Sequence, residues 1–183
     1  MYLGVTGMRK DVYINKDLYK RINDIAESNN TEQMMVFGGK TIGNTVVVDT
    51  NSFVHFDDTV VTSSTRESID VPVYEIELQM YNNYKRRNDT FFMVHSHKPT
   101  ISFLEFAHGD LSDEDEEISE KLRDISRKYC MDYFDGITTG KKLYFWSTEE
   151  KNKPRLMECF IEDEKVDYSL LTTFSEDIEH LFR

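Results

Sequence analysis

Two histidines close an apolar segment near the middle of the chain, FFMVHSH at residues 91–97. The segment has the composition of a buried strand, in which successive side chains alternate between the two faces. His95 and His97 therefore share a face, with Cβ atoms about 7 Å apart, the length of two strand residues. At this spacing both imidazoles can reach one metal ion at the distances of about 2.0 to 2.1 Å typical of zinc and nitrogen. The simpler interpretation of His-x-His alone is a strand end near solvent.

A carboxylate that could complete such a site follows in the sequence LSDED at residues 111–115. Ser112 suits a helix N-cap and Asp115 the third helical position, so a capping box is the structural alternative. Helical spacing turns Asp115 toward the apolar stripe that contains Leu122. A carboxylate buried there needs a cation or hydrogen-bond donors. Glu114 lies on the opposite flank of the same stripe, so helix geometry leaves both acids open.

A third acidic residue, Glu32, precedes an apolar run in TEQMMVFGG at residues 31–39. Two histidines and one aspartate are a ligand set that leaves zinc one position for water, and hydrolysis at such a site needs a nearby general base. Glu32 is the candidate for that base. The alternative is an exposed acid at the start of a strand.

Hydrophobic periodicity predicts the elements that would position these residues. We expect strands at 11–14, 34–37, 45–48, 90–97, 131–137, 142–146 and 156–161, and helices at 16–28, 73–87, from Ser112, and at 167–183. The second helix should bury Ile76, Met80 and Tyr84, and the third Ile118, Leu122, Ile125 and Tyr129. The pattern predicts an α+β fold with a mixed, largely antiparallel sheet wrapped by helices.

Length and composition set outer bounds on function. A chain of 183 residues with no internal repeat and no linker composition fits one domain, 1–183. The net charge of −12 argues against nucleic acid and membrane surfaces as partners. Cys130 and Cys159 have no CxxC spacing and are expected to be core or near-core thiols, and Trp146 should be core. With no targeting segment recognised, we expect a cytoplasmic protein.

Taken together, these motifs resemble the JAMM/MPN (JAB-domain) zinc metalloprotease family. The resemblance rests on Glu32 seven residues before Gly39, the His-Ser-His strand end after a helix, and Ser112-x-x-Asp115 opening the next helix, and it covers residues 12–161 in element order. It implies an MPN/JAB-like fold, with layering similar to that of cytidine deaminases. It also implies that His95, His97 and Asp115 bind Zn²⁺, that Glu32 is the base, and that Ser112 stabilises the oxyanion.

The chain departs from the family pattern in two places. Lys98 stands between His97 and Pro99, where the family has proline directly after the second histidine. The distance from His97 to Asp115 is 18 positions, longer than in the family. Asp110, Asp113 and His108 therefore compete with Asp115 as third ligand; Asp115 alone has the serine three residues before it. The extra length lies in an insertion at 98–110 that could cover the site, grip substrate, or pack as a satellite cluster.

The resemblance implies a zinc-dependent metallopeptidase or isopeptidase that hydrolyses an amide or isopeptide bond at the C-terminus of a ubiquitin-like protein or its conjugate. Two alternatives stay open. One is a catalytically weak or inactive scaffold that binds a ubiquitin-like partner, and the other is a peptidase that acts on short phage or cell-wall peptides. A zinc deaminase is disfavoured because the PCxxC half of its signature is absent.

Overall fold

A computed structural model of the chain describes residues 11–65, 69–96, 113–147, 155–162 and 164–165, without the side chains of 113–116, 155 and 165. The helices are α1 (Lys16–Ser28), α2 (Val73–Lys85) and α4 (Asp113–Lys128). The strands are β1 (Asp11–Ile14), β2 (Met34–Ile42), β3 (Thr45–His55), β4 (Ser63–Ser64), β5 (Ile69–Asp70), β6 (Thr90–Ser96), β7 (Asp132–Thr138), β8 (Leu143–Ser147), β9 (Arg155–Leu156), β10 (Cys159–Ile161) and β11 (Glu164–Lys165).

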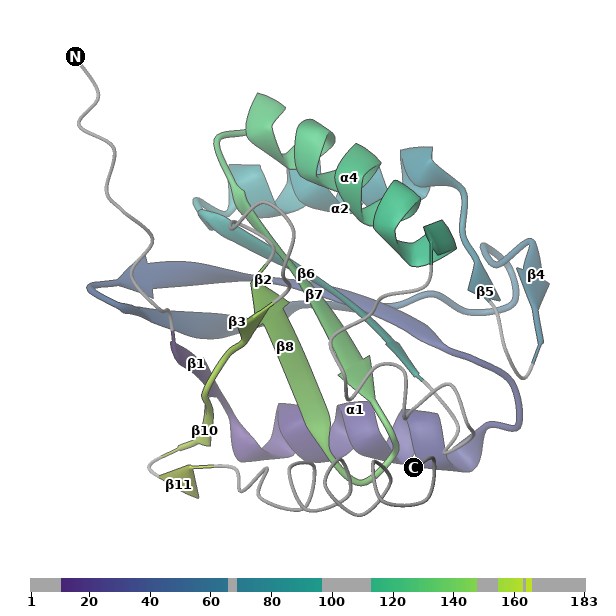
Figure 1. Ribbon diagram of the computed structural model, residues 1–183, viewed down its shortest axis with the longest axis horizontal. Helices are drawn as coiled ribbons and strands as arrows, with labels where there is room; N and C mark the ends of the chain where they lie inside the picture. Colours follow the sequence, from purple (N-terminus) through teal and green to yellow (C-terminus); the bar gives the residue numbers. More distant parts are fainter. Residues whose placement is uncertain (1–10, 66–68, 97–112, 148–154, 163, 166–183) are drawn as a thin grey trace, which may run out of the picture.

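Nine of these strands form one curved sheet in the order β11-β10-β1-β3-β2-β6-β7-β8-β9, and β4 and β5 pair separately (Figure 1). Strand β1 is parallel to β3 and to β10, and β6 is parallel to β7; the other pairs are antiparallel. The predicted α+β class with a mixed, largely antiparallel sheet is confirmed. Helix α4 is the crossover between the parallel strands β6 and β7, as a parallel pair requires.

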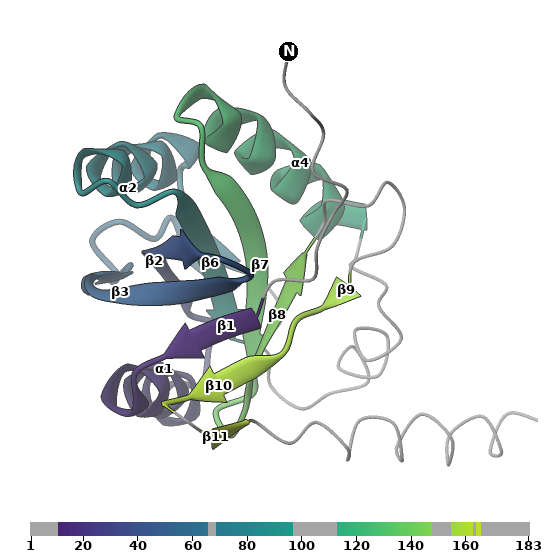
Figure 2. The ribbon, with the colours of Figure 1, turned by 90° about the vertical axis from the view of Figure 1, so that its left-hand side faces the viewer.

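The helices lie on opposite faces of the sheet (Figures 1 and 2). Helix α1 covers one face, where it packs Leu18 and Ile22 on a cluster that includes Phe92. Helices α2 and α4 cover the other face, where Met80 and Leu122 pack on a second cluster. Because β2 and β6 lie between the two clusters, both strands are apolar on both faces, which accounts for their continuous apolar runs.

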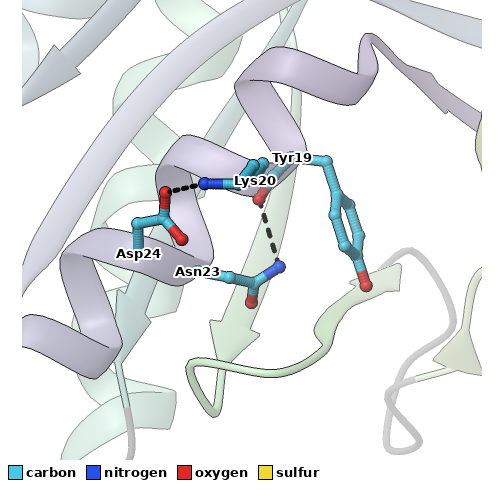
Figure 3. Close-up of polar contacts among 4 residues, drawn as sticks. All are labelled: Tyr19, Lys20, Asn23 and Asp24. Carbon is cyan, nitrogen blue, oxygen red and sulfur yellow. Dashed lines mark hydrogen bonds and ion pairs between the residues drawn. The ribbon is translucent and has the colours of Figure 1, made fainter.

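Helix α1 is attached to the sheet by polar as well as apolar contacts. The Asn15 side chain caps the helix by accepting from the backbone N–H groups of Asp17 and Leu18. Asn23 donates to the Tyr19 carbonyl one turn back, on the side of the helix away from the exposed Lys20–Asp24 ion pair (Figure 3). The Asn23 amide oxygen also accepts from the Thr138 hydroxyl at 2.7 Å, which ties α1 to β7.

Glycines in β2 and in its turn meet two different requirements. Gly43 has φ of +62° at the first position of the two-residue connection between β2 and β3, a conformation that favours glycine. Gly38 follows a register shift between β2 and β3, and a Cβ there would lie 2.0 Å from the amide oxygen of Asn83. Asn83 in turn accepts from Asn88 at 2.8 Å, so this close approach couples α2 to the sheet.

The structure corrects two predicted helix faces. In α2, Ile76 and Met80 are buried as predicted, but the third buried position is Asn83 rather than Tyr84, because seven residues complete two turns more closely than eight do. In α4, Leu122 is buried, whereas Ile118 is 40% exposed and Ser119 is buried in its place. The buried stripe of α4 is thus more polar than its sequence suggested.

The remaining differences concern the strands and turns. Strands β2 and β3 extend beyond the predicted 34–37 and 45–48, to Ile42 and His55. Strands β4 and β5 lie in a polar stretch where no strand was predicted, and the strand predicted at 156–161 is divided between β9 and β10. Trp146 and Cys159 are buried as predicted, but Cys130 is exposed because the chain turns there with a φ of +54°. The insertion at 98–110 and the tail at 167–183 lie outside the described residues. Within the described ranges, no helix combines the length and apolar character that a bilayer crossing requires.

Candidate functional site

The structure describes two of the five predicted site residues with their side chains. Glu32 is 3% exposed and His95 is 7% exposed, so both are buried. Asp115 lies in the first turns of α4, with its side chain not described, as is also true of its competitors Asp113 and Glu114. His97 and Ser112 lie outside the described residues, together with the competitors His108 and Asp110. Within the described residues, no group of three histidine, cysteine or acidic side chains could hold a metal ion.

His95 lies at the carboxyl end of β6, between two strands. It pairs with Met34 of β2 on one side and with Ile137 of β7 on the other. The next residue, Ser96, fixes this end of the strand: its N–H donates to the Gln33 carbonyl at 2.8 Å, and its hydroxyl accepts from the Gln33 N–H at 2.8 Å. Gln33, which follows the predicted base Glu32, is therefore joined by two hydrogen bonds to Ser96, which lies between the predicted ligands His95 and His97.

The backbone of Glu32 is held from its other side by strand β4. Its N–H donates to the Thr65 carbonyl at 2.7 Å, and its carbonyl accepts from the Ser64 hydroxyl at 2.7 Å. The same carbonyl accepts from the Gln33 side-chain amide at 3.0 Å. The peptide groups on both sides of Glu32 are thus fixed, and this restricts the positions that its side chain can reach.

Glu32 and His95 belong to the same face of the sheet by strand alternation. Met34 and Met93 are both in the apolar cluster beneath α2 and α4. His95 is two residues beyond Met93, and Glu32 is two residues before Met34, so an extended chain turns both toward that face. By this alternation, the base candidate and the histidine are both assigned to the face of the sheet that carries α4.

The position of Asp115 on α4 follows from the buried stripe of that helix. Ser119, Leu122 and Ser126 are buried, at spacings of three and four residues. Position 115 is four residues before Ser119 and seven before Leu122, which extends the stripe by one turn toward the N-terminus. Positions 113, 114 and 116 do not fall on this stripe. The choice between Asp115 and Glu114 as the ligand stays a prediction, because the described residues do not include either side chain.

A second buried carboxylate, Asp135 of β7, lies beneath α4 and is 1% exposed. One of its oxygens accepts from the Ser119 hydroxyl at 2.9 Å and from the Tyr133 hydroxyl at 2.7 Å. Burial, followed by the charge of Asp135, holds the pKa of Tyr133 well above its usual 10, so this hydroxyl stays a donor. The hydrogen bond between Ser119 and Asp135 holds this side of α4 against β7, one turn after position 115.

His55 makes a polar contact near the candidate site, and the sequence analysis did not predict this contact. Its Nε2 lies 2.8 Å from the Gln33 side-chain oxygen, on β3 beside the start of β2. The Gln33 amide nitrogen must then be the group that donates to the Glu32 carbonyl. Burial lowers the pKa of His55 below its usual 6.5, which favours the neutral ring. The sequence could not predict this contact, because Gln33 and His55 are 22 positions apart and the register between their segments was not predictable.

Comparison with known proteins gives no family assignment. No protein-family model matches the chain, and no curated protein matches it in sequence. Among solved structures, the protein DSY2949 from Desulfitobacterium hafniense is similar over 84% of this chain and 94% of its own length, with 13% sequence identity and a TM-score of 0.48. A likeness this distant carries no inference about function.

Proposed function

We propose that the protein is a zinc-dependent metallopeptidase or isopeptidase whose site lies where β2, β6 and the N-terminal turns of α4 meet. The observation that carries the proposal is the burial of His95 at the carboxyl end of β6 and of Glu32 just before β2, the strand paired with β6. Buried glutamate and histidine are costly without partners and are frequent at catalytic sites. The position of both residues at the same end of the paired strands supports the proposal.

The donor set suits zinc. His95, His97 and Asp115 would hold the ion, because imidazole nitrogens and a carboxylate oxygen are its usual ligands in catalytic sites. His95 supplies a buried imidazole. Helical spacing gives position 115 the same phase as the buried residues Ser119 and Leu122, which supports its choice as the third ligand. When bound, zinc would act as a Lewis acid that lowers the pKa of water and polarises a carbonyl group.

Glu32 would take a proton from the attacking water and deliver it to the leaving amine. A general base of this kind typically contributes about 10² to 10⁴-fold to the rate. The Ser112 hydroxyl would donate to the oxyanion that develops on the carbonyl oxygen. The hydrogen bonds that the Glu32 backbone donates to Thr65 and accepts from Ser64 and Gln33 would keep Glu32 from moving between these two proton transfers.

The substrate class comes from the family resemblance in sequence. It is an amide or isopeptide bond at the C-terminus of a ubiquitin-like protein or its conjugate. We propose a cytoplasmic setting for this reaction, because Cys130 and Cys159 are free thiols, which are typical of a reducing compartment.

Metal analysis of the purified full chain tests the site. We expect about one zinc per chain, lost in His95→Ala and in His97→Ala and retained in His55→Ala, which removes a histidine that we do not place at the metal. Asp115→Asn should weaken zinc binding, whereas Asp113→Asn should not. Full zinc occupancy in a double His95→Ala, His97→Ala variant would contradict the proposal.

Turnover of a ubiquitin-like fusion tests the base. Glu32→Gln should keep zinc and the fold but lose cleavage by about 10² to 10⁴-fold. The matched control is Glu27→Gln on α1, since that glutamate is exposed on the opposite face. A protein that binds zinc and a ubiquitin-like partner but never cleaves would instead be the scaffold alternative, and undiminished cleavage by Glu32→Gln would assign the base elsewhere.

A further inference from the structure

Helix α2 has a second apolar stripe that faces away from the sheet. Tyr74 is 68% exposed, Leu78 48% and Tyr81 39%, at spacings of four and three residues. The buried positions Ile76, Met80 and Asn83 lie on the opposite side of the helix. A surface helix normally places charged and polar residues on its outer side, so a helix that is apolar on both sides is expected to have a partner on each.

Further tyrosines widen this exposed stripe. Tyr84 is 52% exposed, and its ring centroid lies 6.0 Å from that of Tyr129, which also lies 6.2 Å from Tyr81. Tyrosine is enriched at protein interfaces because it combines a large apolar surface with a polar end. We refer to Tyr74, Leu78, Tyr81 and Tyr84 as the α2 stripe.

The charges beside the α2 stripe are arranged with opposite signs at its two ends. Glu75 and Glu77 lie in the first half of the helix, whereas Arg86 and Arg87 follow its last residue. Lys85 lies on the stripe itself, with its Nζ 4.7 Å from the centre of the Tyr81 ring. Glu75 and Arg86 are eleven residues apart, which is three helical turns, so they lie on the same flank of the stripe. A surface of this kind is complementary to itself when a second copy is rotated by a half turn.

We propose that the α2 stripe is the interface of a homodimer in which two α2 helices pack antiparallel about a two-fold axis between Leu78 and Tyr81. In this arrangement Leu78 meets the partner's Tyr81, and Glu75 meets the partner's Arg86, twice by symmetry. The antiparallel helix dipoles are also favourably aligned. This interface lies on α2, away from β2 and β6, and is independent of the proposed hydrolase function.

The net charge of −12 on each chain opposes association. At physiological ionic strength this repulsion is screened beyond about 8 Å, so the local pairs and the apolar stripe decide the outcome. The dimer should therefore strengthen as salt is raised from low to physiological concentration, because the long-range repulsion is screened more than the close contacts.

A complementary charge exchange tests the proposal by sedimentation velocity or light scattering over a dilution series of the full chain. The wild type should approach twice the 21.6 kDa mass of the chain at high concentration. Glu75→Arg and Arg86→Glu should each be monomeric over the same range, because each places like charges opposite one another at both ends. A mixture of the two variants should dimerise, because both pairs are then restored with reversed sign.

Controls for charge and folding come from the opposite face of the sheet. Lys16→Glu and Glu27→Arg on α1 change exposed charges at the same eleven-residue spacing and should leave dimerisation unchanged. Leu78→Gln should weaken the dimer without any change in charge. Far-UV circular dichroism should be the same for all variants.

Three results would overturn the proposal. They are a wild type that stays monomeric at every concentration, a dimer that survives both single exchanges, and a mixture of the exchanged variants that stays monomeric.

Discussion

The two faces of the sheet bury different kinds of side chain. Beneath α1, the ring of Phe92 lies between those of Phe37, Phe134 and Phe145, with centroid distances of 5.1, 5.4 and 5.1 Å. Beneath α2 and α4, the apolar cluster is bordered by buried ionisable groups, namely Glu32, His95, Asp135 and Tyr133. The face beneath α1 is a packed aromatic core, and the face beneath α2 and α4 combines an apolar core with the candidate site.

Under the proposed function, this difference would place stability and catalysis on opposite sides of the same strands. Burying an ionisable group is unfavourable unless its hydrogen bonds are satisfied, and it weakens the face on which it occurs. The aromatic face can offset that cost because its rings bury large apolar areas in preferred geometries. We therefore expect mutations on the α1 face to act on unfolding, and those beside Glu32 to act on turnover.

The largest effect should come from the neighbouring pair Phe91 and Phe92, which are both fully buried and face opposite sides. Phe92→Ala should lower the free energy of unfolding by about 3 to 5 kcal/mol, from lost burial and a cavity. Phe91→Ala should cost less, because within the described part of the chain its ring has no aromatic partner, and such pairs add about 0.5 to 1.5 kcal/mol each. Urea denaturation of both variants measures the difference, and an equal or larger loss at Phe91 would contradict the comparison.

Tyr133→Phe sharpens the comparison on the α4 face. Removing a hydrogen bond to a buried carboxylate should cost about 1.5 to 3 kcal/mol. Because the pKa of Tyr133 is raised above 10 in the folded chain, its contribution is complete below pH 10 and is lost as the pH rises above that value. Unfolding at pH 7 and above pH 10 should therefore differ less in the variant than in the wild type. Tyr129→Phe is the control, and a loss as large there would argue against a special role for Asp135.

Ser64→Ala tests whether the contact with β4 positions Glu32. If Glu32 is the base, kcat should fall about tenfold, equivalent to about 1.4 kcal/mol, with KM and zinc content unchanged. Ser63→Ala is the matched control, since Ser63 is the exposed neighbour. Ser64→Thr, which keeps the hydroxyl, should restore most of the rate. Equal rates for the Ser63 and Ser64 variants would remove β4 from the positioning of Glu32.

The smallest effect should come from His55. Its pKa is lowered by burial, so the unfolded chain binds more protons just below pH 6.5, and the free energy of unfolding should fall as the pH decreases through that region. His55→Gln should remove this part of the pH dependence. Denaturation at pH 7.5 and pH 5.5 compares the two slopes, and identical slopes would show that His55 does not titrate differently on folding.

The longer periodic segments could be predicted from the sequence because local pattern and tertiary burial agree there. Strand β1 and helix α1 match the predicted 11–14 and 16–28 at both ends. Strands β4 and β5, with two residues each, carry no periodicity, and their place beside Glu32 depends on hydrogen bonds between distant segments. A short polar strand of this kind cannot be predicted from its own residues.

The sequence indicates the residue types of the candidate site, whose roles stay predictions, but it does not indicate their surroundings. Glu32 and His95 are buried, whereas the sequence alone had left an exposed position open for each. On α4, the polar Ser119 is buried and the apolar Ile118 is exposed, the opposite of what was expected, because Ser119 hydrogen-bonds to Asp135 of β7. Pairing between a helix and a distant strand decides which side of α4 is inward, and the apolar spacing of a single helix does not contain that information.

The parallel pairing of β6 with β7 bears on the long interval between His97 and Asp115. The relative position of the two strands is set by their own hydrogen bonds and by α4, so the residues at 97–112 only have to join fixed ends. Doubling the length of such a connection costs only about 0.6 kcal/mol in chain entropy. If His95, His97 and Asp115 form the proposed site, the interval between them can therefore vary at small cost in free energy while the strand and the helix that carry them keep their positions.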